Sequence, residues 1–426
     1  MKDKTEFSIS LKLSHIKIKR VEIDKVNDFH IYVSCQSDST LCHKCNQVIS
    51  KSHGQCSETI IQHLPILDNR VFIHVSWPRF ICDKCDGQPT TSFHPEWLSE
   101  SGDCTKDYEN YILKCLINST VKDVAEKNKT TEERIEGIIN RRILLDVNWE
   151  EMKITRMGVD EIALKKGHNH YLSIISDISI PGRTRIIKVL DGRSQEEILP
   201  FFKSIPKNIW QQLESVSTDM GVSYLSTLRK VLDEYLFDKI VTIDRFHVAK
   251  IINGKVDKER KKVCHAYKKE HKDDEVALDK IKDTMWPFRH HPESLDEDEL
   301  KRLEILFKAS PDLKVCHEIR EELYQIFESD LTKEIAKTEI DAWCLLALGF
   351  SEKNNPFESF VKTYYQHESI ILNYFVKRHS SGPVEGLNNK IKVIKRRGFG
   401  FDNVLNFAKR LFLDINLKEQ FIPKLA

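Results

Sequence analysis

The sequence has no long apolar run. None of its 426 residues belongs to a stretch approaching the ~18 uninterrupted apolar residues that a membrane-spanning helix needs. The N-terminus is charged from Lys2 onwards and lacks the apolar core of a signal peptide. These absences predict a cytoplasmic protein that makes no use of a membrane.

The chain also has little net charge and no basis for a disulfide framework. Its net charge of +1 gives no overall attraction to nucleic acid, so any such attraction must be local. Its 11 cysteines are an odd number, which in a cytoplasmic chain argues against structural disulfides. No internal repeat or low-complexity tract is present, and the length predicts two to four domains.

Four of the cysteines form two Cys-x-x-Cys pairs, Cys42 with Cys45 and Cys82 with Cys85. A tight turn with this spacing brings two thiolates to one ion, and two such turns complete a tetrahedral site for structural Zn²⁺. Residues 1–100 otherwise have the pattern of short strands, too small a part to bury much core without a staple. We expect two strands between the pairs, as in a zinc ribbon.

Helical spacing follows the strand-rich part, with three short helices. Thr120 and Thr130 resemble capping residues of the second and third helices. Val124-Ala125 and a break at Asn128 give these two helices the pattern of a helix-turn-helix, although a plain helical linker bundle remains the alternative. The third helix would enter the major groove of DNA with Arg134, Asn140, Arg141 and Arg142.

Residues 154–245 alternate between strand and helix patterns, which predicts an α/β domain. The expected helices cover residues 194–203 and 222–235. The expected strands cover residues 154–164, 171–178, 184–190, 214–218 and 239–243. Residues 246–375 are almost wholly helical in pattern.

Three acidic residues are candidates for metal chemistry. Asp160 and Asp219 each end a predicted strand, and Glu385 opens a basic helix. Acidic residues just past strand ends are where an open sheet presents its chemistry. Three carboxylates can hold two hard cations, such as Mg²⁺ or Mn²⁺. Taken singly, an Asp at a strand end is more often a cap or turn residue, so the residues alone leave both interpretations open.

Positive charge gathers around Glu385. Residues 377–397 contain seven lysines or arginines and one acid, Glu385 itself. A solvated helix face is one interpretation, and a surface for backbone phosphates is the other. The candidates for phosphate contact are Lys390, Lys392, Lys395, Arg396 and Arg397.

Several longer motifs follow one another along the chain. They are the Cys42/Cys45/Cys82/Cys85 module with Gln62-His63-Leu64-Pro65 between its pairs, the predicted helix-turn-helix, Gly158-Val159-Asp160-Glu161 with Lys165-Lys166-Gly167-His168, Ser217-Thr218-Asp219-Met220, Ile243-Asp244-Arg245-Phe246-His247-Val248, and Val384-Glu385-Gly386-Leu387-Asn388-Asn389-Lys390-Ile391-Lys392. In this order they resemble the ISL-three family of insertion-sequence transposases, along nearly the whole chain.

The resemblance implies a ribonuclease-H-like catalytic domain with an Asp-Asp-Glu triad of Asp160, Asp219 and Glu385. Asp244 is a rival for the second position. The resemblance also implies a helical insertion ahead of the helix that carries Glu385. The chain would then be multidomain, with a zinc-binding β module (1–100), a helix-turn-helix DNA-binding domain (101–150), the first part of the catalytic domain (151–272), an all-α insertion (273–375) and the C-terminal catalytic part (376–426).

Such a protein would bind the terminal inverted repeats of its element, cleave DNA strands and transfer their 3′ ends to target DNA. The resemblance implies a homodimer or larger assembly on double-stranded DNA, in the bacterial cytoplasm at the nucleoid. Two other classes stay open. One is a DNA-binding regulator with structural carboxylates, and the other is a nuclease without strand transfer.

Overall fold

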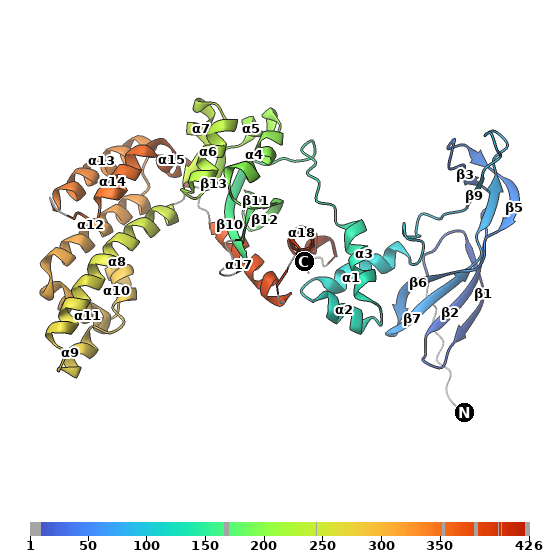
Figure 1. Cartoon of the computed structure of the whole chain (residues 1–426), viewed down its shortest axis with the longest axis horizontal. Helices are drawn as coiled ribbons and strands as arrows, with labels where there is room; N and C mark the ends of the chain where they lie inside the picture. The colour runs from blue at the N-terminus through green and yellow to red at the C-terminus, as the bar shows by residue number, and fades with distance from the viewer. Residues whose placement is uncertain are drawn as a thin grey trace. The chain divides into compact units, whose positions relative to one another are not determined.

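The computed structural model describes residues 10–165, 170–243, 245–351, 354–378, 382–398, 400–401 and 403–421 (Figure 1). The chain forms two compact units. One combines the residues up to Leu144 with those from Lys409 onwards, and the other comprises Leu145–Ala408. Within the described ranges, no helix has both the length and the apolar character needed to cross a membrane.

The first unit begins with a four-stranded sheet. Apolar side chains at alternate positions of its strands form one core, which includes Ile31, Ile61, Val71 and Ile73. In spatial order, the strands are β1 (Ile16–Ile23), β2 (Phe29–Cys35), β7 (Asn69–Val75) and β6 (Thr59–Ile66). The strand-rich character predicted for this part of the chain is confirmed.

The cysteine pairs belong to a separate, smaller β region. Cys42, Ile49, Phe80 and Cys82 form its buried core. One sheet pairs β3 (Thr40–Leu41) with β4 (Val48–Ile49), and the other holds β5 (Lys51–Gln55), β8 (Pro78–Ile81) and β9 (Thr90–Ser92). The expectation of two strands between the pairs is wrong. Five strands, β4 to β8, lie there, and β6 and β7 pair within the larger sheet.

Three helices complete the N-terminal part: α1 (Lys106–Leu116), α2 (Val121–Lys127) and α3 (Glu132–Arg142). Thr120 caps α2 as expected, its hydroxyl accepting a hydrogen bond from Asp123 N. The cap of α3 is Thr131, which accepts from Arg134 N, so the prediction of Thr130 is wrong by one residue. Adjacent threonines offer the same chemistry, and the spacing does not distinguish them.

The first unit also includes residues from the C-terminal end of the described chain, which pack on its helices. α18 (Val404–Leu411) starts in the second unit and ends in the first, and it is followed by a π-helix (Phe412–Asn416) and α19 (Lys418–Phe421). Arg410 is buried, donates hydrogen bonds to the carbonyls of Leu116 and Ser119, and pairs with Asp414. Asp414 in turn accepts from Asn118 N at 2.9 Å. These contacts satisfy carbonyls at the end of α1 that the helix itself leaves free.

Replacing Arg410 by Ala should therefore loosen α1 although the two are distant in sequence. The change leaves the buried Asp414 carboxylate without its cation, which costs roughly 3–5 kcal/mol. In the full chain we expect amide hydrogen exchange near the end of α1 to accelerate at least about 100-fold. Lys409→Ala is the control, because Lys409 makes an exposed hydrogen bond to Asn140 and its loss should change exchange little. Equal exchange in both variants would contradict this role for Arg410.

The second unit is built on a five-stranded sheet. In spatial order, its strands are β12 (Arg183–Asp191), β11 (His170–Ile180), β10 (Arg156–Lys165), β13 (Ser215–Thr218) and β14 (Val241–Ile243). β12, β11 and β10 are antiparallel neighbours, whereas β13 and β14 run parallel to β10. All five strands fall where the sequence predicts them, although β14 is shorter than expected.

One face of this sheet packs on short helices. Met157 and Val159 of β10 share a core with Ile198, Phe202 and other side chains of these helices. The helices are α4 (Gln195–Ser204), α5 (Lys207–Gln212), α6 (Val222–Val231) and α7 (Glu234–Ile240). The helical pattern predicted for residues 222–235 is divided between α6 and α7, and β14 begins two residues later than the predicted start at residue 239. Asp233 accepts from Leu236 N and starts a new helix that ends only at Ile240.

A helical region follows β14, as predicted for residues 246–375. Its first helix, α8 (Arg245–Glu270), continues the core of the sheet through Val248, Ile252 and Val256. The others are α9 (Glu275–Lys280), α10 (Met285–Arg289), a 3-10 turn (Pro292–Ser294), α11 (Glu297–Ala309), α12 (Pro311–Glu328), α13 (Lys333–Gly349), α14 (Glu358–Gln366), α15 (Glu368–Leu372) and α16 (Tyr374–Lys377). The chain then returns to the sheet as α17 (Gly382–Arg397), seen beside β10 in Figure 1.

Candidate functional site

The four cysteines of the two pairs meet in one cluster. Their Sγ atoms all lie within 4.8 Å of one another, with 4.0 Å between Cys42 and Cys85 and 3.8 Å between Cys45 and Cys82. Four sulfurs at about 2.3 Å from a tetrahedral zinc stand about 3.8 Å apart. The cluster therefore has the dimensions of a four-thiolate metal site.

The thiols also have the electrostatics of a metal site. Backbone N–H groups of Cys45 and Lys44 lower the pKa of Cys42 to about 6. Hydrogen bonding to the Cys45 thiol raises the pKa of Cys85 to about 12. The first thiolate thus forms readily, whereas a full set of four carries more negative charge than the site itself can offset. A dication held by these thiolates would supply the missing positive charge.

The second cluster lies beside the middle of β10 and the carboxyl end of β13. The prediction that Asp160 ends its strand is wrong, because β10 continues to Lys165, whereas Asp219 directly follows Thr218, the last residue of β13. These strands are parallel, and Gly158 pairs with Ser217. Asp160 and Asp219 each lie two residues beyond this pair, and we infer from the register that their side chains are directed to the same face. The two carboxyl groups are close enough to interact, since Asp219 is one cause of the raised pKa of Asp160.

Asp160 is surrounded by groups that affect its charge. Burial raises the pKa of its carboxyl, and the neighbouring Asp219 carboxylate raises it further, whereas Glu161 N, His247 and Asn388 act in the opposite direction. The carboxylate of Asp219 bends back to accept from Gly221 N at 2.8 Å. Two neighbouring carboxyl groups in a half-buried place form a site that favours a cation.

Helix α17 lies along β10 and covers this place. A Cβ at Gly158 would stand only 2.5 Å from Val384 Cγ2, Asn388 Nδ2 donates to Asp160 at 2.6 Å, and Lys395 Nζ donates to the carbonyl of Ala163 at 2.9 Å. From Val384 to Lys395 the helix rises about 16 Å, and from Gly158 to Ala163 the strand extends by about the same length. The helix and the strand therefore run side by side in the same direction.

Glu385 is exposed and lies one helical turn before Asn388. Apart from the four cysteines, no described group of three or more His, Cys, Asp or Glu brings its ligand atoms within 4.8 Å of one another. Glu385 therefore stands farther out than a closed ligand set would require. Asp244, the rival for the second position, lies outside the described residues, as do residues 166–168 of the neighbouring motif.

The basic candidates on α17 have different environments. Lys390, Lys392 and Arg396 are exposed. Lys395 and Arg397 are half-buried, and Lys395 is held by the backbone of β10. The exposed set is the part of this helix whose position suits phosphate contact.

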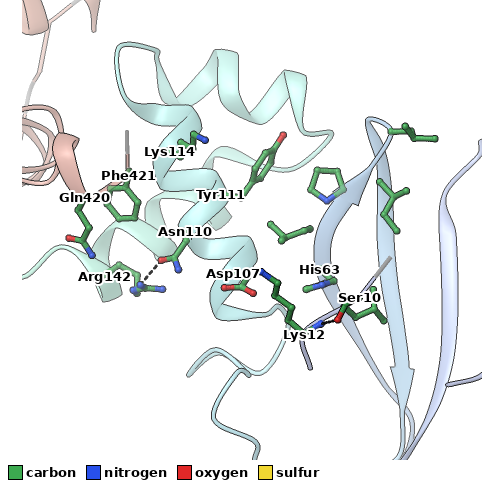
Figure 2. Close-up of a pocket in the computed structure, with 15 residues that line it drawn as sticks. Ser10, Lys12, His63, Asp107, Asn110, Tyr111, Lys114, Arg142, Gln420 and Phe421 are labelled. Atoms are coloured by element: carbon green, nitrogen blue, oxygen red, sulfur yellow. Dashed lines mark hydrogen bonds between the residues drawn. The ribbon is translucent and has the colours of Figure 1, made fainter. Parts of the chain in front are cut away.

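The four candidates on α3 are engaged within the first unit. Arg141 and Arg142 both bind the carboxylate of Glu109, which is only 3% exposed, at 2.8 and 2.9 Å. Figure 2 shows Arg142 directed at Asn110 of α1, on the wall of a surface pocket. Arg134 pairs with Asp103, and the carboxamide oxygen of Asn140 accepts from Lys409 Nζ. The exposed residues of α3 are Glu132, Glu133, Glu136 and Asn140.

Comparison with known proteins identifies the family. A family model of the ISL-three group, described as a transposase, matches residues 157–411, well over half of the chain. The chain belongs to the ISL-three family of transposases. It is 26% identical over 396 residues to the transposase for insertion sequence element IS1001 of Bordetella parapertussis, covering 90% of this chain and 91% of that relative. It is 22% identical over 324 residues to the transposase for IS1557 of Mycobacterium tuberculosis, covering 72% and 66%.

Two residues near the carboxylates of this ISL-three transposase were not picked out from the sequence. Asn388 and His247 both belong to motifs on which the family resemblance depends, but the sequence assigns no role to either residue. Asn388 could have been found, since it is a polar residue on the apolar face that Val384, Leu387 and Ile391 define. His247 gives no such signal, because only the fold brings the start of α8 close to Asp160.

The close approach of α17 and β10 gives a prediction for the transposase. Gly158→Ala should cost about 1–3 kcal/mol of folding free energy, because the new methyl group meets Val384 at 2.5 Å and Ser176 Oγ at 2.7 Å. Adding Val384→Ala removes one of these clashes, so the double variant should be more stable than the sum of the two single changes predicts. Denaturant unfolding of the four proteins measures this coupling. Simple additivity would mean that α17 does not dock on β10 in this way.

Proposed function

We propose that this transposase cleaves and joins DNA with a ribonuclease-H-like domain that uses Asp160, Asp219 and Glu385 as its metal-binding triad. The strand order β12-β11-β10-β13-β14, with three antiparallel strands followed by two parallel ones, supports this fold. So does the return of the chain, after a long helical region, in a helix that lies on the first strand.

The observation that carries the proposal is the register of β10 and β13, which brings Asp160 and Asp219 together beneath α17. The donor set fits hard dications, because carboxylate and amide oxygens are their preferred ligands. Two Mg²⁺ or Mn²⁺ ions held there would activate the attacking water or 3′-hydroxyl and stabilise the leaving oxygen. Glu385, on the exposed side of α17, would complete the ligand set when DNA is bound.

The chain's other residues would hold the substrate. Lys390, Lys392 and Arg396 are exposed on α17 near Glu385, and we propose that they bind backbone phosphates beside the cut. Lys395, fixed on β10, and Arg397 would add positive charge to the same helix face without leading the contact.

We propose that the first unit recognises the ends of the element and that two or more chains assemble on the DNA. We propose that its four cysteines hold Zn²⁺ and that α2 and α3 form a helix-turn-helix. If Arg141 and Arg142 turned to DNA, Glu109 would be left as an unpaired buried charge, which costs roughly 3–5 kcal/mol. These arginines would therefore position α3, and exposed lysines such as Lys122, Lys127 and Lys129 would approach the DNA.

The test is a cleavage assay with the purified full chain and a labelled duplex that carries one end of the element. We expect Mg²⁺-dependent nicking at the end and transfer of the 3′ end to a second duplex. Specific binding without cleavage in either Mg²⁺ or Mn²⁺ would instead support a regulator. Cleavage without any joined product would support a nuclease.

A further inference from the structure

Asn388 occupies a place that an amide would not ordinarily take. It is only 7% exposed, and it lies on the inner face of α17 among Val384, Leu387 and Ile391. Burying an amide costs roughly 1–3 kcal/mol for each polar group that is not compensated. An apolar residue here would extend the stripe that packs on β10, so the amide needs a compensating contact or a functional reason.

One half of the amide has its contact. Nδ2 donates to Asp160 Oδ2 at 2.6 Å, and Glu161 N donates to Asp160 Oδ1 at 2.7 Å. Both oxygens of the Asp160 carboxylate are therefore held, and its plane is fixed by one side chain and one backbone group. The opposite orientation of the amide would place its oxygen against a carboxylate oxygen, which is repulsive, so the charge of Asp160 sets the orientation.

The other half of the amide, its oxygen, has no hydrogen-bond partner among the described residues. Oδ1 of Asn388 is buried and accepts no hydrogen bond from any described residue. One more buried oxygen without a partner among the described residues, Ser217 Oγ, belongs to the strand that ends just before Asp219, two residues from that acid. An amide oxygen without a donor, next to a carboxylate that faces a second carboxylate, is an arrangement that a hard cation satisfies and a hydrogen-bonded core does not.

We propose that Asn388 has two roles in the site of the proposed triad: its NH₂ group positions the carboxylate of Asp160, and its amide oxygen is a further ligand of the cation that Asp160 and Asp219 hold. The inference rests on the proposed function, because it requires that this cation binds at Asp160. It adds a neutral oxygen to the acidic ligands, which raises the number of ligands without adding to the repulsion between Asp160 and Asp219.

The experiment measures Mn²⁺ binding to the full chain without DNA, by isothermal titration calorimetry or by the electron paramagnetic resonance of free Mn²⁺. Asn388→Leu keeps the number and branching of the side-chain heavy atoms and removes both polar atoms. We expect its melting temperature without metal to be equal or higher and its Mn²⁺ affinity to be at least about tenfold weaker. The matched control is Asn389→Leu, an exposed neighbour on the same helix, which should stay within about twofold of the unchanged protein.

A second variant covers the case in which the leucine variant folds poorly. Asn388→Asp keeps oxygen ligands but places a third carboxylate beside Asp160. It should bind Mn²⁺ at least as tightly as the unchanged chain and have a lower melting temperature without metal. Unchanged Mn²⁺ affinity in Asn388→Leu, together with lost binding in Asp160→Asn, would overturn the role of Asn388 alone. Unchanged affinity in Asp160→Asn would overturn the proposed metal site itself.

Discussion

Asp160→Asn should reduce Mg²⁺-dependent strand cleavage by at least about a thousandfold. A metal-bound oxygen gains several kcal/mol of transition-state stabilisation from its cation, and each 1.36 kcal/mol is a factor of ten in rate. The melting temperature should not fall. Burial and Asp219 raise the pKa of Asp160, so the ionised carboxylate opposes folding above that pKa and a neutral amide does not. Asp219→Asn and Glu385→Gln should lose cleavage likewise, and the triple variant should be hardly worse than any single one.

Glu161 offers a matched control for this loss. It is adjacent to Asp160 but pairs with Arg193 at 2.8 Å, and adjacent residues of a strand point to opposite faces. Glu161→Gln should therefore keep cleavage within about tenfold, since an exposed ion pair contributes only about 0–1 kcal/mol. Asp244→Asn decides the rival assignment. Lost cleavage in that variant, with retained cleavage in Asp219→Asn, would make Asp244 the second ligand. Wild-type cleavage by Glu385→Gln would refute the triad.

Cys82→Ser should unfold the small β region around the cysteines. Structural zinc contributes roughly 10–16 kcal/mol in small modules, and this region has only four buried residues of its own, two of them cysteines. The four-stranded sheet has a separate core, so we expect it to survive. Hydrogen exchange should show full loss of protection in β3, β4, β5, β8 and β9, with β2 and β7 protected. Elemental analysis should show one zinc per chain before the change and none after it.

Cys56→Ser is the control for the zinc prediction. Cys56 is half-buried, lies between the two pairs in sequence and contacts Ser92 Oγ rather than the cluster. The variant should keep its zinc and its protection. Unchanged folding of the unaltered chain after complete zinc removal would show that the cluster is not a structural metal site.

The strands of the α/β domain were predictable because their apolar runs are long. β11 and β12 each exceed the predicted range by only one or two residues at either end, and the pattern correctly puts Asp219 at the end of β13, although it does not show that β10 continues beyond Asp160. The zinc ligands were predictable from spacing alone. Spacing does not say which strands pair, and so the sequence could not show that β6 and β7 belong to a different sheet from the cysteines.

The roles of the charged residues on α3 could not be predicted. Arg141 and Arg142 have the composition of a DNA-reading helix, but their partner Glu109 lies more than thirty residues earlier, on a face of α1 that only the packed bundle buries. The same limit applies to Asn388, because its distance from Asp160 in sequence is 228 residues. A local pattern gives the type of an element reliably and the partner of a polar side chain hardly at all.

The position of Arg410 in the sequence determines when the first unit can complete its folding during synthesis. Its bonds to the end of α1 join residues 294 and 291 positions apart. At about 5–20 residues per second, a ribosome needs roughly 15–60 s to go from Leu116 to Arg410. For that time the N-terminal helices exist on the nascent chain without the side chain that closes them. A transposase interrupted before α18 would thus carry an incomplete first unit, and only a chain extended through this helix would have both units complete.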